Sequence, residues 1–195
     1  MNSYTPSELI KTVYSYILTK VFNSQARLIR RPIYIRGCKS ISGGKGLTTG
    51  RFCRFDLIGN KKTLFIGDNC EFGDMTHIVA YDNVKIGNNV LIASKCFISD
   101  TNHGNYIGDN QDAPNTPPND RKLFTQEVVI GNNVWIGENV VVLAGSQIGD
   151  GCIIGANSVV KGVFESNVII AGAPARAVKK YDNQTKKWEK IERLL

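Results

Sequence analysis

Aliphatic residues recur every six positions from Ile130 to Val160. Glycine follows the aliphatic residue at most repeats, and a small residue returns four places after it. The aliphatic series is Ile130, Ile136, Val142, Ile148, Ile154 and Val160. Neither an α-helix, with a period of about 3.6, nor a β-strand, with a period of about 2, needs this spacing. A fixed short repeat is typical of a solenoid, in which each coil buries its apolar face against the neighbouring coils.

The same pattern occurs in two earlier blocks that are offset by two residues. The first block is Ile66, Phe72 and Ile78, and the second is Ile86, Ile92 and Ile98. A fainter series (Ile35, Ile41, Leu47 and Cys53) predicts irregular first coils. Chance alternation in a β-sandwich does not account for so many positions in register. We therefore predict an all-β solenoid, a parallel β-helix over residues 35–179, with Gly or Asn at its turns.

The repeat is interrupted once, between Ile98 and Ile130. The next aliphatic position would fall near residue 104, so about 26 residues leave the coil. This excursion, residues 104–127, contains three prolines together with Asn, Asp and Gly. Loops longer than about 12–15 residues are usually functional or disordered. We therefore expect the excursion to cover a site.

The two ends of the chain follow other patterns. Residues 1–34 are basic, and apolar residues at helical spacing predict a helix over residues 7–29 that Ser7 would cap. This segment is too polar to span a bilayer, and it lacks a signal-peptide cleavage pattern. Residues 180–195 predict a short, charged C-terminal helix.

The charge is distributed unevenly along the chain. The net charge is +7, with +6 in residues 1–40, +4 in residues 176–195 and −3 between them. A basic amphipathic helix is typical of contact with an anionic membrane surface, but packing on the solenoid or on a neighbouring subunit would explain it equally well. The basic residues form no nucleic-acid-binding motif, so no nucleic-acid partner is expected.

The five cysteines show no paired metal-ligand spacing. Three of them, Cys70, Cys96 and Cys152, occupy the small inward position of the repeat, where a free thiol packs as a compact hydrophobic group. An odd, scattered set of cysteines is typical of a reducing compartment. We therefore expect a cytoplasmic protein, with no redox role and no metal site built from these thiols.

Candidate chemistry lies at the interruption of the repeat. One of the two histidines, His103, occurs there with Asp100 and Asn102. A hydrogen bond from one ring nitrogen to Asp100 or to a carbonyl would fix the tautomer, and the other nitrogen could accept a proton from a substrate hydroxyl. We predict that His103 is the catalytic base and that Asp100 and Asn102 belong to the same catalytic group. His77 lies inside an intact coil and is expected to be structural.

Several segments resemble the hexapeptide-repeat acetyltransferases, a family that includes galactoside, maltose and serine O-acetyltransferases. The matching segments are IGNNVLIA at 86–93, DTNH at 100–103, VIGNNVWIG at 129–137, IGANSVVK at 154–161 and AGAPARAVK at 171–179. The resemblance covers about residues 66–179. The segment RRPIYIRG at 30–37 is more similar to the branch that acetylates lipopolysaccharide O-antigen and capsule.

The resemblance implies a left-handed β-helix, a homotrimer with active sites between its subunits, acetyl-CoA as the donor, and no metal. The family's catalytic histidine falls on His103, and its indole near the acetyl group falls on Trp135. The positions that contact CoA fall on Ala156, Lys161, Gly162, Arg176 and Lys179, with Lys161 displaced by one residue from the family's usual place. The acceptor-binding positions expected on this chain are Asp74, Asn83, Tyr106, Arg121 and Phe124.

The implied reaction is direct transfer of acetyl to a sugar hydroxyl, in lipopolysaccharide O-antigen or another surface polysaccharide, with a backbone N–H stabilising the oxyanion. Two alternatives are an N-acetyltransferase acting on an amino sugar nucleotide and a detoxifying enzyme of the galactoside or maltose type. A γ-class carbonic anhydrase would need three zinc-binding histidines per site, and this chain has two histidines in all. A non-catalytic scaffold would leave His103, the excursion and the basic pair Arg176 and Lys179 unexplained. The acceptor stays open between a free sugar, a nucleotide sugar and a lipid-linked glycan.

Overall fold

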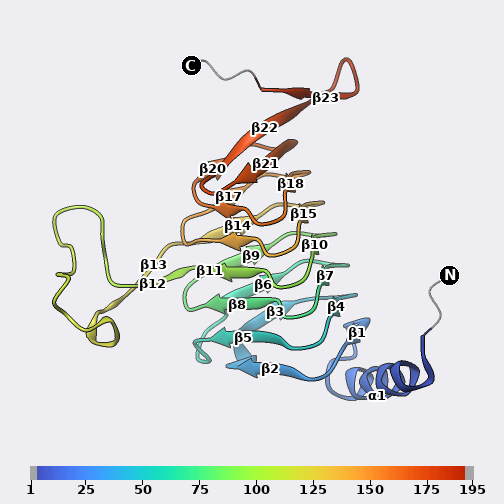
Figure 1. The fold of residues 1–195 in the computed structure, drawn as a ribbon. Coiled ribbons are helices and arrows are strands. Elements are labelled where there is room, and N and C mark those ends of the chain that lie inside the picture. The colour runs from blue at the N-terminus through green and yellow to red at the C-terminus, as the bar shows by residue number, and fades with distance from the viewer. Residues whose placement is uncertain (1–3, 192–195) are drawn as a thin grey trace.

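The computed structural model describes residues 4–191 and is a parallel β-solenoid, as the repeat predicts (Figure 1). Each complete coil adds one strand to each of three sheets, here called A, B and C. The parallel strands of sheet A are β1 (Leu28–Ile29), β4 (Thr48–Thr49), β7 (Glu71–Phe72), β10 (Leu91–Ile92), β15 (Trp135–Ile136), β18 (Ile153–Ile154) and β21 (Val168–Gly172). Those of sheet B are β2 (Ile33–Arg36), β5 (Cys53–Leu57), β8 (His77–Ala80), β11 (Phe97–Ser99), β16 (Val141–Val142) and β19 (Val159–Val160). Those of sheet C are β3 (Ile41–Gly43), β6 (Leu64–Ile66), β9 (Val84–Ile86), β14 (Val128–Ile130), β17 (Gln147–Ile148) and β20 (Val163–Phe164).

The six-residue repeat supplies the interior of the solenoid. All six aliphatic residues of the regular block are buried to 2 % exposure or less. Ile130 pairs with Ile148 eighteen residues later, so three hexapeptides make one coil. Ile78 pairs with Ile98 twenty residues later, which accounts for the offset of two between the earlier blocks. Stacked aliphatic columns bury apolar area at every coil, which is the main driving force for this fold.

Tight turns at the corners explain the recurrent Asn and Gly. Asn133 and Asn157 adopt left-handed backbone angles, with φ of 55° and 59°, which asparagine tolerates better than most residues. A side chain on Gly87 would lie 2.6 Å from the carbonyl carbon of Gly131 in the next coil. Glycine at this place therefore lets successive coils stack closely.

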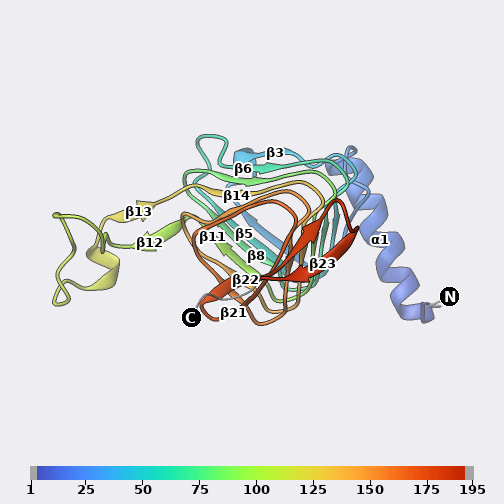
Figure 2. The same ribbon diagram turned by 90° about the horizontal axis from the view of Figure 1, so that it is seen from above.

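The excursion leaves the solenoid at the corner between sheets B and C. Ile92 pairs with Ile136 forty-four residues later, whereas Ile136 pairs with Ile154 eighteen residues later, so 26 residues are inserted. The excursion begins with β12 (Thr101–His103) and returns through β13 (Leu123–Thr125), which is antiparallel to β12; a short 3₁₀ helix, η2 (Pro118–Asp120), lies between them. This arm projects away from the coils (Figures 1 and 2). The expectation that this excursion covers a site therefore stays a prediction.

The N-terminal helix is shorter than predicted. Helix α1 spans Pro6–Phe22, and its N-cap is Thr5, not Ser7. The solenoid already begins at β1, so residues 28–34 belong to the first coil and not to a helical segment; a 3₁₀ turn, η1 (Cys38–Ser40), follows β2. Within residues 4–191, no helix is long and apolar enough to cross a membrane.

The predicted C-terminal helix is wrong. Strand β22 (Ala175–Asp182) pairs antiparallel with β21, and β23 (Lys187–Lys190) pairs with β22, so both extend sheet A. Tyr181 and Trp188 lie opposite each other in this hairpin, with ring centroids 5.3 Å apart. A cross-strand aromatic pair stabilises a hairpin, and it outweighs the helical propensity of the surrounding charged residues.

Candidate active site

His103 lies at the base of the arm, where β12 ends. Its backbone is held by pairing with Leu123 and by the hydroxyl of Tyr106, which donates a hydrogen bond to the His103 carbonyl. The side chain is exposed and borders a cavity of about 320 Å³. The residues that line this cavity are Arg36, Arg54, Asp56, Leu57, Val79, Tyr81 and His103. A base at the edge of an open cavity can reach a substrate hydroxyl.

Asp100 is fully buried and holds the corner between sheets B and C. Its carboxylate accepts hydrogen bonds from the backbone N–H groups of residues 81–83, at 3.0, 2.7 and 2.8 Å, and from the hydroxyl of Thr101 at 2.6 Å. Within the described residues 4–191, it makes no hydrogen bond to the ring of His103. Asp100 therefore holds the backbone from which the arm leaves. It does not orient the imidazole of His103 directly, as the hypothesis required. Asn102 pairs with Phe124 across the arm.

Asn83 lies at the same corner. Its amide nitrogen donates to Glu127 at 2.7 Å, and Lys85 contacts the same carboxylate oxygen at 2.6 Å. Its amide oxygen is buried and has no hydrogen-bond partner among residues 4–191. A buried amide oxygen without a partner is costly, so Asn83 is suited to accept a hydrogen bond from a bound molecule.

The predicted acceptor-binding residues of the arm mainly support the arm itself. Arg121 donates to the carbonyls of Thr116 at 2.9 Å and Pro114 at 3.3 Å, and to the hydroxyl of Tyr106. Phe124 is half-buried in β13. None of Tyr106, Arg121 and Phe124 lines the cavity beside His103.

A charged cluster in this cavity could not be recognised from the six-residue pattern. Asp56 is 7 % exposed and contacts Arg36 Nε at 2.5 Å, Arg54 Nε at 2.7 Å and His77 Nε2 at 3.0 Å. Burial raises the pKa of Asp56, but the hydrogen bonds from Arg36 and His77 and the charge of Arg54 outweigh it, so the pKa lies below its ordinary value. Arg36, Arg54 and Asp56 come from the irregular first coils, where the repeat is too faint to reveal which side chains face outward.

Three of the residues expected to bind acetyl-CoA lie on sheet A. They are Trp135, expected near the acetyl group, and Arg176 and Lys179, expected near the phosphates. Trp135 is 51 % exposed and stacks in register with Ile153, Ile169 and Lys179. A bulge opposite Ile169 and Ile170 shifts the register of β22, so that Lys179 pairs with Ile169 and Arg176 with Ala171. Directly paired residues point to the same face. The bulge therefore places Arg176 and Lys179 on the outer face that carries Trp135.

The remaining predicted residues are divided between two corners of the solenoid. Asp74 and Ala156 lie between sheets A and B, where Asp74 accepts a hydrogen bond from the N–H of Arg51 at 2.7 Å. Lys161 and Gly162 lie between sheets B and C, two coils above the arm. In a three-sided prism this second corner is opposite sheet A. One chain therefore does not bring His103 and Trp135 into a common cleft.

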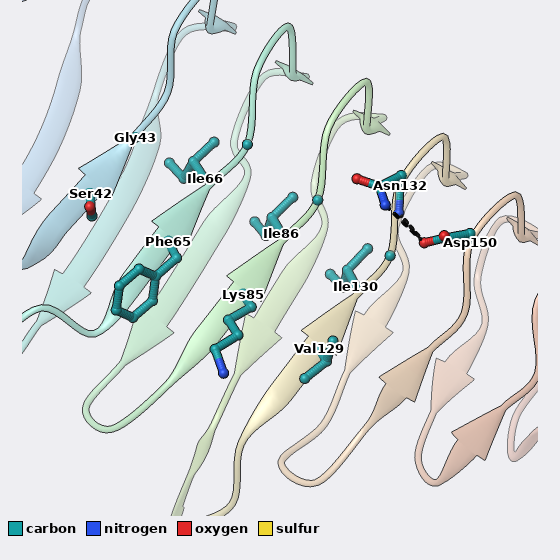
Figure 3. Close-up of a pocket in the computed structure, with 13 residues that line it drawn as sticks. Ser42, Gly43, Phe65, Ile66, Lys85, Ile86, Val129, Ile130, Asn132 and Asp150 are labelled. Atoms are coloured by element: carbon teal, nitrogen blue, oxygen red, sulfur yellow. Dashed lines mark hydrogen bonds between the residues drawn. The ribbon is translucent and has the colours of Figure 1, made fainter.

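A second groove, of about 560 Å³, runs across sheet C (Figure 3). Phe65, Lys85 and Val129 lie along its floor. Its charged groups already have partners, because Lys85 pairs with Glu127 and Asp150 accepts from the N–H of Asn132 at 2.6 Å. Among residues 4–191, the ionisable side chains that line this groove are therefore already paired.

The inward placement of three cysteines is confirmed. Cys70, Cys96 and Cys152 are buried, and so is Cys53, whereas Cys38 is exposed. Burial raises the pKa of each buried thiol, which keeps it protonated and unreactive. Within residues 4–191, no three His, Cys, Asp or Glu side chains are placed to hold a metal ion.

The six-residue repeat and the parallel β-solenoid that it forms define the class as hexapeptide-repeat proteins. Residues 127–162 match the model of the bacterial transferase hexapeptide (six repeats) family. The chain is 47 % identical over 182 residues to an Escherichia coli (strain K12) protein provisionally named lipopolysaccharide biosynthesis O-acetyl transferase WbbJ, covering 93 % of this chain and 92 % of that one. The chain therefore belongs to the hexapeptide-repeat acetyltransferase family.

More distant relatives agree with this assignment. Galactoside O-acetyltransferase of Escherichia coli (strain K12) is 34 % identical over 123 residues, which are 63 % of this chain and 57 % of that enzyme. Among solved structures, a mutant of the N-acyltransferase AntD of Bacillus cereus, in a complex with dTDP-4-amino-4,6-dideoxyglucose and coenzyme A, superposes with a TM-score of 0.68. Its sequence identity is 22 %, over 83 % of each chain, so this similarity concerns the fold alone.

Proposed function

We propose that the protein transfers an acetyl group from acetyl-CoA to a sugar hydroxyl during synthesis of lipopolysaccharide O-antigen or a related surface polysaccharide. The observation that carries the proposal is the placement of His103, exposed at the rim of a polar cavity at the single break of the solenoid. The 47 % identity to WbbJ over nearly the whole chain supports the substrate class. We propose that the reaction takes place in the cytoplasm.

The active site in this proposal is shared by two subunits of a homotrimer. His103, Asn83, Lys161 and Gly162 lie at the corner between sheets B and C, whereas Trp135, Arg176 and Lys179 lie on sheet A. Packing this corner of one subunit against sheet A of the next would create one cleft from both sets. Such a head-to-tail contact closes into a ring when the rotation allows it. The projecting arm would then reach the neighbouring subunit.

The chemistry follows from the groups on each side of this cleft. Acetyl-CoA supplies the acetyl thioester. A neutral His103 accepts the proton of the sugar hydroxyl as that oxygen bonds to the thioester carbonyl carbon, and it returns the proton to the departing sulfur. Arg176 and Lys179 suit phosphate oxygens of the donor, and the indole of Trp135 provides an apolar surface near the acetyl end.

Replacing His103 tests the proposal directly. Labelled acetyl-CoA is incubated with undecaprenyl-linked, nucleotide-linked and free sugars, and His103→Ala should reduce transfer by about 10²–10⁴-fold while CoA still binds. Lys122→Ala, an exposed change in the same arm, is the control and should retain activity. Normal turnover in His103→Ala would refute the role of this residue. An alkali-stable product would indicate an amide and favour the alternative, acetylation of an amino sugar nucleotide.

We further propose that α1 contacts the inner face of an anionic membrane. The polar face of the helix packs on the solenoid: Thr19 Oγ1 accepts from the N–H of Ile29 at 2.8 Å, Ser15 Oγ accepts from the N–H of Arg31 at 3.2 Å, and Glu8 pairs with Arg51 at 2.7 Å. Ser15 and Thr19 are the buried residues of this helix. These polar contacts fix the helix orientation.

The opposite face of α1 is apolar and open to solvent. The exposed residues of this stripe are Leu9, Ile10, Val13, Tyr14, Ile17 and Val21. Ile10 and Val21 are 69 % and 67 % exposed, which is unusual for aliphatic residues at helical spacing. Lys11 and Lys20 flank the stripe. An apolar stripe with basic flanks is typical of a helix that lies in the membrane interface.

A further inference from the structure

The cavity beside His103 contains more positive charge than its own carboxylate balances. Arg36 and Arg54 share one partner, Asp56. Arg36 pairs with Asp56 across strands β2 and β5, and Arg54 is two residues before Asp56 on β5. Two guanidinium groups against one carboxylate leave a net charge of about +1 among these three side chains.

The geometry of the cluster leaves the outer ends of both guanidinium groups free. Each arginine contacts Asp56 through Nε, at 2.5 Å for Arg36 and 2.7 Å for Arg54. Within residues 4–191, no Nη atom of either side chain makes a hydrogen bond, and the side chains are 70 % and 49 % exposed. Asp56 therefore orients two arginines whose paired Nη donors face the cavity and solvent. Such donors match two oxygens of a phosphate group.

We propose that the acceptor carries a phosphate or diphosphate group, which Arg36 and Arg54 bind beside His103. The inference rests on the proposed function, because it concerns the acceptor of that reaction. His103 follows β11, and Arg54 lies in β5, two strands away in sheet B. Strands β11 and β5 are about 10 Å apart, and His103 and both arginines border the same cavity, so a sugar can lie between the phosphate group and the base. The sugar hydroxyl would face His103 while the phosphate stays at the arginines.

The alternative is that the cluster of Arg36, Arg54 and Asp56 only stabilises the contact between the first two coils. A contact of that kind needs one arginine on Asp56, and it would gain nothing from a second one with free donors. Tyr81, which also lines the cavity, adds a phenol within reach of a bound anion. His77 completes the contacts of Asp56, so the carboxylate is held by three donors and can keep both arginines in place.

The test measures binding of inorganic pyrophosphate to the full-length protein by titration calorimetry, without acetyl-CoA. The variants are Arg36→Gln and Arg54→Gln, singly and together. The control is Arg27→Gln, because Arg27 also pairs with one carboxylate, Glu71 at 3.0 Å, and is 55 % exposed, but lies outside the cavity. We expect each cavity variant to weaken binding by about tenfold or more and the control to leave it unchanged. Thermal unfolding of each variant checks that it is folded.

Two further probes distinguish the source of the phosphate. UDP-N-acetylglucosamine represents a nucleotide-linked sugar, and farnesyl diphosphate represents a lipid diphosphate. If one of these probes binds more tightly than pyrophosphate, and this binding is lost in Arg54→Gln, the result supports the site and identifies the source of the phosphate. No pyrophosphate binding to the unaltered protein, or an equal loss in Arg27→Gln, would overturn the inference. Because these measurements do not involve turnover, they can fail while the result for His103→Ala still supports acetyl transfer, and the reverse also holds.

Discussion

At the scale of single residues, the candidate site separates groups that react from groups that hold the backbone. His103 is exposed beside the cavity, whereas Asp100, three residues earlier, is buried and accepts four hydrogen bonds. Two residues of the same short motif therefore have different functions. The distinction depends on which way each side chain points, so substitutions at the two positions should affect different properties, activity at His103 and stability at Asp100.

Asp100→Asn should lower stability without changing the pH profile of activity. An amide cannot accept at both ends, so at least one buried N–H at the corner would lose its partner, at a cost of about 1–3 kcal/mol. Urea denaturation measures this loss, and the pH profile of kcat/KM should match that of the unaltered protein. A shifted pH profile with unchanged stability would instead indicate that Asp100 acts on His103.

Cys53 should make the protein less stable in alkali. Burial raises the pKa of its thiol from 9.0 to about 11. Between these values the unfolded chain loses the proton while the folded chain keeps it, so stability falls as pH rises, by at most about 1.4 kcal/mol per pH unit. In urea denaturation from pH 8.5 to 11, Cys53→Ala should show a shallower decline, and Cys38→Ala, at an exposed position, should not. Identical slopes for the two variants would contradict this prediction.

At the scale of elements, α1 and the arm both extend from the solenoid in ways that local sequence does not settle. The arm leaves the corner between sheets B and C, and α1 lies on the other side of the prism (Figure 2). Amphipathicity predicted the helix, but not that its polar face would pack inward through Ser15 and Thr19. The direction in which each element faces determines what it can contact.

The exposed stripe of α1 should bind anionic vesicles. In co-sedimentation with vesicles of phosphatidylethanolamine and phosphatidylglycerol, replacing Ile10 and Ile17 by Ser should reduce the bound fraction about tenfold or more, because two aliphatic side chains leave the interface. Val163→Ser, at a position 75 % exposed and distant along the solenoid, is the matched control. If the double variant binds vesicles as well as the control does, the helix covers another surface, such as a second copy of the chain.

At the scale of the whole molecule, the division of the site between two faces predicts complementation between subunits. His103→Ala and Trp135→Ala should each be inactive or strongly impaired. When the two variants are denatured, mixed in equal amounts and refolded, roughly a quarter of the sites should receive His103 from one variant and Trp135 from the other. Activity should therefore return to about that fraction, measured as acetyl transfer per subunit. No recovery in mixtures that form trimers would mean that one chain supplies both residues.

Much of the solenoid could be predicted because its repeat is a local property. Inward residues such as Ile136 and Ile154 are specified by position alone, and the 26-residue insertion follows from where the pattern stops and resumes. The C-terminal hairpin could not be predicted, because the pairing of Tyr181 with Trp188 competes with helical propensity and is visible only after the chain turns. The cluster of Arg36, Arg54 and Asp56 was missed for a related reason, since it joins two coils across a faint repeat.

The sequence by itself determined the coil period, the buried aliphatic columns, the position of the break and the identity of its histidine. These depend on spacing, and a short repeat can bury its apolar side chains only by stacking. The tertiary structure decided which outward side chains become neighbours. In the folded chain, Asp100 binds the backbone of the corner between sheets B and C, and a bulge brings Arg176 and Lys179 to the face of Trp135. The polar side of α1 packs against the solenoid. Such contacts depend on strand register and on hydrogen bonds between distant segments, which periodicity does not encode.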